Sequence, residues 1–84
     1  MNKEELITKL KVIIKPYTAN TDAYDNLTEI TDFINDLGIN SANLVDIVLD
    51  IEENFDVVID NTDMERMLDV KNAVEIIATK LAAK

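Results

Sequence analysis

The chain has 84 residues and a formal net charge of −9 at pH 7, from 17 acidic and 8 basic side chains, with no cysteine and no histidine. This composition excludes disulfides and thiolate metal sites and removes the commonest general base, so a self-sufficient hydrolase or metalloenzyme is disfavoured. With one glycine and one proline, it favours helices over hairpin-rich sheets, and we expect a single small domain spanning residues 1–84.

The charges are segregated along the chain. No Lys or Arg lies between Lys15 and Arg66, and that interval holds thirteen acidic residues. A surface of this sign would repel nucleic acid and anionic membrane and would suit a partner with a basic patch. The first five residues lack the apolar region of a signal peptide, and no apolar run reaches transmembrane length. We therefore expect a cytoplasmic protein with no membrane insertion.

Residues 3–15 are predicted to form a first helix that ends before Pro16, because Leu6, Leu10, Ile13 and Ile14 follow one helical stripe. Residues 16–40 are predicted to be a long loop between the first two principal helices. Apolar residues recur in it at near-helical spacing, and we expect them to pin the loop onto the core, with a short helical turn around 29–35. They are Leu27, Ile30, Phe33, Ile34 and Leu37. Gly38 supplies backbone freedom where the chain turns into the next helix.

Residues 41–55 are predicted to form the second principal helix, with Asn40 as its N-cap. Its core stripe consists of Leu44, Ile47, Val48, Ile51 and Phe55, and the acids Asp46, Asp50 and Glu53 lie on the far side. Val45 and Leu49 fall between these two faces, on the side of Ser41. They could be the edge of the core or contacts for a partner, and periodicity alone slightly favours the core edge.

The remainder of the chain predicts a connector, a short helix and a last long helix. The connector, 56–63, contains the apolar run 57–59, but no second strand exists to pair with it. The connector has no glycine, and its acidic residues do not have the spacing of a calcium-binding loop, so no dedicated metal site is expected. The short helix spans about 62–67, with Met64, Met67 and Leu68 facing inward. Asp69 is predicted to cap the last helix, about 70–82. The predicted fold is therefore all-α, a small bundle of three principal helices plus one short helix.

Ser41 is the most informative polar residue of the second helix. A catalytic serine needs a base, and no histidine or nearby lysine can supply one, so we predict no catalytic residue. The start of a helix would stabilise a phosphodiester on the Ser41 hydroxyl through free N–H groups and the helix dipole. A serine is also an ordinary residue at a helix start, and the local sequence alone favours that interpretation.

Residues 33–41, F-I-N-D-L-G-I-N-S, resemble the segment of acyl carrier proteins that leads into the modified serine, F-x-x-D-L-G-x-D-S-L. The resemblance continues without a gap through residues 45–48 and 51–56, which resemble that family's V-E-L-V and L-E-E-x-F-D. Residues 59–61 stand where the family usually has I-P-D, and residues 70–77 match its last helix. About residues 30–80 are covered, and the first helix is compatible with the family.

The resemblance implies a non-catalytic four-helix carrier, expected as a monomer. A phosphopantetheinyl transferase would move 4′-phosphopantetheine from coenzyme A onto Ser41, and the thiol of that arm would carry an acyl chain as a thioester. Acyl-transfer and chain-elongation enzymes of fatty-acid, lipid or polyketide-type synthesis would dock the second helix through basic patches. The implied partner-binding residues are Ala42, Val45, Asp46, Leu49, Glu52 and Glu53.

Four positions depart from the family pattern. Asn40, Ala42 and Asn43 replace the usual Asp, Leu and acid around the serine, and Asp60 replaces a proline. These differences fit a specialised carrier that serves a dedicated pathway. The alternatives are an aminoacyl or peptidyl carrier domain, whose serine motif tends to read G-G-x-S-L, and an unmodified interaction module.

Overall fold

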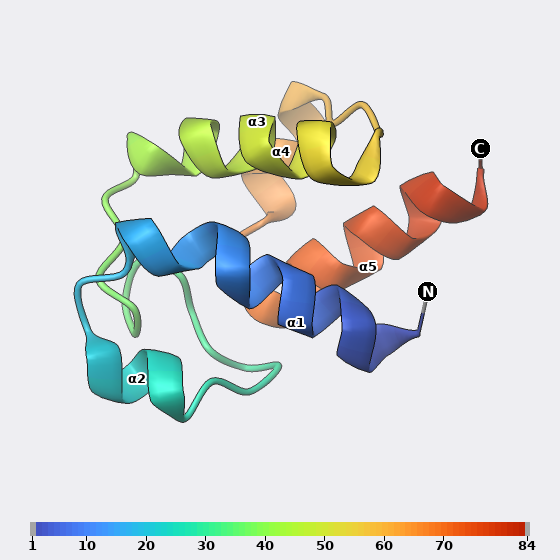
Figure 1. The fold of residues 1–84 in the computed structure, drawn as a ribbon. Helices are drawn as coiled ribbons and strands as arrows, with labels where there is room; N and C mark the ends of the chain where they lie inside the picture. Colours follow the sequence, from blue (N-terminus) through green and yellow to red (C-terminus); the bar gives the residue numbers. More distant parts are fainter. Residues whose placement is uncertain (1, 84) are drawn as a thin grey trace.

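Five α-helices and one 3₁₀ turn make up most of residues 2–83, the part of the chain that the computed structural model describes (Figure 1). The elements are α1 (Lys3–Ile14), η1 (Lys15–Tyr17), α2 (Thr21–Asp25), α3 (Asn43–Phe55), α4 (Asn61–Arg66) and α5 (Val70–Ala82). The three longest helices, α1, α3 and α5, correspond to the three principal helices predicted from periodicity. The all-α prediction is confirmed, and α4 is the short helix that was predicted at 62–67.

Side-chain caps explain where most of these helices begin. Asn2, Asn20, Asp60 and Asp69 each accept a hydrogen bond from the backbone N–H three residues later, at the starts of α1, α2, α4 and α5. Such caps satisfy one of the backbone donors that a helix start leaves free. The prediction that Asp69 caps the last helix is confirmed.

The apolar stripes of the long helices meet in one core. Helix α1 packs against both α3 and α5. The predicted stripe residues of α1 are all buried, and Ile47, Val48, Ile51 and Phe55 of α3 are buried with them. Leu44, at the start of α3, is only partly buried against this core. Burial of these Leu, Ile and Val side chains is the main force that holds the helices together.

The segment between α1 and α3 differs from the prediction. Helix α2 forms inside the predicted loop, ahead of the apolar residues that begin at Leu27, and a hydrogen-bonded turn over 32–37 replaces the helical turn expected around 29–35. In that turn Asp32 accepts the N–H groups of Ile34 and Asn35 through its side chain. Phe33 and Leu37 are fully buried, as predicted. The prediction that Ile30 and Ile34 face the core is wrong, because they are 84% and 37% exposed.

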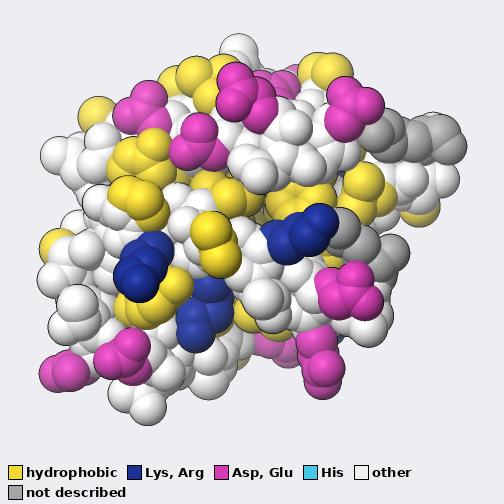
Figure 2. All heavy atoms as spheres, viewed as in Figure 1, with side chains coloured by type: hydrophobic (Ala, Val, Ile, Leu, Met, Phe, Trp, Pro, Cys, Tyr) yellow, Lys and Arg dark blue, Asp and Glu magenta, His cyan; other side chains and the backbone are white. Residues whose placement is uncertain are grey.

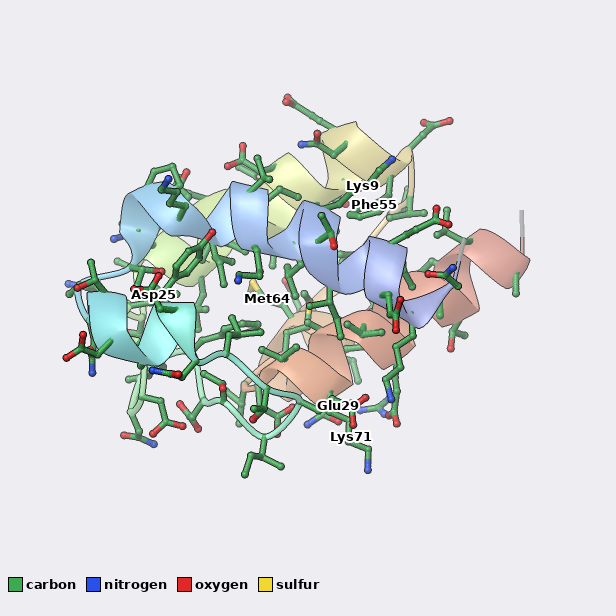
Figure 3. The ribbon with its side chains drawn as sticks, turned by 60° about the horizontal axis from the view of Figure 1, so that its bottom comes forward. Lys9, Asp25, Glu29, Phe55, Met64 and Lys71 are labelled. Carbon is green, nitrogen blue, oxygen red and sulfur yellow. The ribbon has the colours of Figure 1, made fainter. Side chains whose placement is uncertain are left out.

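Residues 29–33 of this segment run antiparallel to residues 68–71. The N–H of Phe33 donates to the carbonyl of Leu68 (3.0 Å), that of Val70 to Thr31 (3.1 Å), and that of Lys71 to Glu29 (2.9 Å). Figure 3 shows Glu29 and Lys71 at the edge where the two segments meet. This pairing accounts for Leu68, which was predicted to face inward and is 48% exposed. Within residues 2–83 it amounts to one isolated bridge and no strand.

Several basic side chains brace the fold. Lys9 Nζ lies 5.8 Å from the centroid of the Phe55 ring, and Figure 3 shows these two side chains side by side. Lys11 lies over a second ring, that of Tyr24, at 4.9 Å. Lys3 pairs with Glu29 at the start of α1. Lys80 of α5 lies 2.8 Å from the Asp63 carboxylate of α4 and so joins these two helices. These cations are therefore engaged within the molecule.

The two ends of the chain lie far from the start of α3. In Figure 1 the start of α1 and the end of α5 occupy one end of the molecule, and the first turn of α3 occupies the other. Among the helices described, none has the length and apolar character needed to cross a membrane.

Candidate functional site

Ser41 lies in a turn that leads into α3. The helix begins at Asn43, two residues later than predicted, and the cap position is Ala42, which makes no side-chain capping bond. Asn40 stabilises the turn instead, since its side-chain oxygen accepts the N–H of Ala42 and its carbonyl accepts the N–H of Asn43, both at 2.9 Å. The prediction that Asn40 is the N-cap of a helix starting at residue 41 is corrected accordingly. The amide of Asn40 makes the same kind of bond that a carboxylate could make there, but without its charge.

The Ser41 hydroxyl is available to solvent. The residue is exposed, and within residues 2–83 no hydrogen bond occupies its side chain. The expected free N–H groups are not all present, because those of Ala42 and Asn43 bind Asn40 and that of Leu44 binds the Ser41 carbonyl (3.2 Å). The dipole of the 13-residue helix α3 remains to favour negative charge at this end. An exposed hydroxyl of this kind can accept a bulky covalent group.

The chain just before Ser41 is held from two sides. Leu37 accepts the N–H groups of both Ala19 and Asn20 through its carbonyl, each at 3.0 Å. Ile39 is buried, and its N–H donates to the carbonyl of Phe33 at 3.0 Å. Between them Gly38 adopts a φ of +70°, in the left-handed region that glycine tolerates without strain. Ser41 therefore follows an anchored segment.

Five of the predicted partner-binding residues form an exposed face along α3. Val45 and Leu49 are 48% and 53% exposed, so they project from the helix and do not pack at the edge of the core. Ala42, Asp46 and Glu53 are exposed as well. We call these five residues the exposed α3 face. Figure 2 shows acidic side chains with hydrophobic ones between them along the edge where α3 lies.

Two other acids of α3 have partners within the molecule. The Glu52 carboxylate accepts the N–H of Ile59 at 2.8 Å and is only partly exposed. Asp50 accepts the hydroxyl of Tyr17 at 3.1 Å. That hydrogen bond, followed by desolvation and the negative charges of Asp50 and Asp46, raises the pKa of Tyr17 above its usual value of 10.0. Sequence reasoning missed both contacts, because their partners come from segments that no pattern links to α3.

No metal-binding cluster accompanies the serine in the part of the chain described. Over residues 2–83 the structure contains no group of three or more His, Cys, Asp or Glu side chains placed to hold a metal ion. The site thus consists of an exposed serine in a braced turn, next to an acidic and apolar helix face.

Comparison with known proteins identifies what this arrangement is. Residues 22–79 match the family described as "Phosphopantetheine attachment site". The chain is 36% identical to the acyl carrier protein of Thermotoga maritima over 80 aligned residues. This alignment covers 95% of this chain and 96% of that protein. The chain is 37% identical over 81 residues to the acyl carrier protein of Petrotoga mobilis, with coverage of 96% and 93%. The solved acyl carrier protein of Enterococcus faecalis shares its fold with a TM-score of 0.77, at 28% identity over 95% of this chain and 99% of that one.

The fold and the site define a small helical carrier domain of the phosphopantetheine-binding class. The chain belongs to the acyl carrier protein family, whose members are non-catalytic carriers. The resemblance seen over about residues 30–80 is therefore confirmed.

Proposed function

We propose that Ser41 is the residue that carries 4′-phosphopantetheine in this protein. The observation that supports this assignment is the exposed and unengaged hydroxyl of Ser41, presented by the Asn40 turn at the start of α3. Ser41 is also the only serine in the chain. When bound, the arm supplies a thiol that holds acyl intermediates as thioesters, which a chain without cysteine cannot supply itself.

The attachment requires an external enzyme. The Ser41 oxygen forms a bond to the pantetheine-side phosphorus of coenzyme A, the pyrophosphate bond breaks, and adenosine 3′,5′-bisphosphate leaves. The proton of the hydroxyl must pass to a base on the phosphopantetheinyl transferase, because the chain has no histidine and Ser41 bonds to no basic side chain within residues 2–83. This chain contributes an accessible hydroxyl and the dipole of α3, which favours the phosphodiester product.

The exposed α3 face is the surface through which we expect enzymes to recognise the carrier. Its acids Asp46 and Glu53 flank the exposed apolar residues Val45 and Leu49. A partner with apolar contacts inside a basic rim fits this pattern. We expect the transferase and the acyl-transfer and chain-elongation enzymes to be such partners. Ala42 offers a smaller apolar contact than the Leu usual in the family, which suits a partner adapted to this carrier.

Intact-mass measurement tests the assignment of Ser41. Co-expression with a phosphopantetheinyl transferase is expected to add the mass of one phosphopantetheine to the wild-type chain. The Ser41→Ala variant keeps every threonine of the chain and is expected to gain nothing, while its circular dichroism shows whether it is folded. A persistent gain in the variant, or no gain in the wild type with several transferases of different specificity, contradicts the proposal.

The same measurement on protein from its own cells identifies the cargo. An acyl mass on the arm supports a carrier of acyl chains, and an aminoacyl mass supports the alternative carrier class. A bare chain mass in cells that modify other carriers supports an unmodified interaction module.

A further inference from the structure

Glu52 is joined to the connector that follows α3 by both its backbone and its side chain. Its carbonyl accepts the N–H groups of Asp56 and Val57, the latter at 3.3 Å. Its carboxylate Oε2 accepts the N–H of Ile59 at 2.8 Å. Within residues 2–83 this is the only side-chain hydrogen bond that holds residues 57–59. Glu52 therefore fixes the path of the chain between α3 and α4.

The connector covers one side of the core. Val57 and Ile59 are each only 8% exposed, whereas Val58 between them is 76% exposed, so alternate side chains turn inward in an extended segment. The next helix, α4, is held separately, by the Asp60 cap and by the ion pair between Asp63 and Lys80. Loss of the Glu52–Ile59 bond would thus loosen residues 57–59 without freeing α4.

The Glu52 carboxylate also borders the exposed α3 face. Glu52 follows Val45 by seven residues and Leu49 by three, which places it about 20° and 60° from them around the helix axis. The side chain is partly exposed. A basic group of a partner that docks on Val45 and Leu49 is therefore within reach of Glu52.

We propose that an arginine of a docked partner enzyme takes the Glu52 carboxylate from Ile59, so that docking loosens the connector over the core. This inference rests on the proposed function of the exposed α3 face. A guanidinium binds a carboxylate through both oxygens in a fixed fork geometry. To present both oxygens to a partner on the exposed α3 face, the Glu52 side chain must turn toward that face, and Oε2 then moves away from the Ile59 N–H. Val57 and Ile59 belong to the buried apolar core of the molecule. A loosened connector therefore uncovers Val57 and Ile59, which are buried when the Glu52–Ile59 bond is intact.

Amide hydrogen exchange of the full chain, followed by NMR, tests this coupling. The probe is a phosphopantetheinyl transferase, added without coenzyme A so that Ser41 is not modified. At saturation, exchange of the Ile59 amide is expected to accelerate about tenfold, as for the loss of one hydrogen bond. The Met67 amide, which donates to Met64 at the end of α4, is expected to be unchanged.

Two variants separate the charge pair from general weakening of the surface. Glu52→Gln keeps an oxygen for Ile59 but cannot form the bidentate charge pair, so the Ile59 amide should stay protected in the complex. Asp46→Asn removes one charge from the same face and weakens docking, but at saturation its Ile59 amide should accelerate as in the wild type.

Each outcome has a distinct meaning. Docking that leaves the Ile59 amide of the wild type protected overturns the coupling and leaves the proposed function intact. If docking still accelerates exchange of the Ile59 amide in Glu52→Gln, the coupling is also overturned and the proposed function is again intact. If none of several transferases of different specificity binds the chain, and none modifies it when coenzyme A is added, the proposed function and the coupling are both overturned.

Discussion

Substitution of Gly38 tests how firmly the segment before Ser41 is held. Gly38 has a φ of +70°, and a Cβ added there would lie 3.2 Å from the Cβ of Ala19. A left-handed backbone costs an L-residue roughly 1–2 kcal/mol, so Gly38→Ala should lower the free energy of unfolding by about that amount. In a domain of this size such a loss lowers the melting temperature by roughly 5–15 °C. Thermal unfolding followed by circular dichroism measures it.

Two further variants separate the backbone effect from the contact with Ala19. Asn tolerates the left-handed region better than Ala, so Gly38→Asn should lose less stability. The double variant Gly38→Ala, Ala19→Gly has no close contact between these two Cβ atoms, but it should still show most of the loss in free energy of unfolding. If Gly38→Asn costs as much stability as Gly38→Ala, or if Ala19→Gly restores full stability, the argument from φ is refuted.

Two predictions concern the charges. Because the pKa of Tyr17 is raised in the folded state, the Tyr17–Asp50 bond stabilises the protein fully below about pH 10 and is lost as pH rises through the folded pKa. The melting-temperature difference between wild type and Tyr17→Phe should therefore shrink above that pH, and a constant difference up to about pH 11 argues against the bond. Unpaired acids repel one another, so added sodium chloride or millimolar magnesium should raise the melting temperature. A melting temperature independent of both contradicts clustered repulsion.

The parts of the fold that the sequence predicted are those that bury an apolar stripe. Helices α1, α3 and α5 each carry residues spaced to face one core, so periodicity alone placed them to within two residues. Helix α2 was missed because none of its residues is fully buried and its contacts, such as the bond of the Tyr24 hydroxyl to the Lys11 carbonyl, come from a distant segment. Five residues rich in Thr and Asp are typical of a loop, and only the surrounding structure selects the helix.

The errors at exposed apolar residues have a related cause. Ile30, Ile34 and Leu68 matched a helical spacing, but their segments pair as extended chains and turns. Pairing between residues 29–33 and 68–71 joins segments about forty residues apart, and one sequence carries no local signal of it.

The candidate site was predicted in part. The resemblance identified Ser41 and the helix after it, whereas local physics left the serine ambiguous. The sequence also grouped Glu52 with the other acids that are predicted to bind partners. Only its bond to Ile59 distinguishes it from Glu53, and that bond depends on how the connector folds back.

The placement of the chain ends determines how this carrier can be handled. Because α1 starts and α5 finishes at the end of the molecule away from the first turn of α3, a tag at either terminus leaves the serine clear. The protein can therefore be immobilised on a sensor surface through either end with Ser41 turned toward the solution.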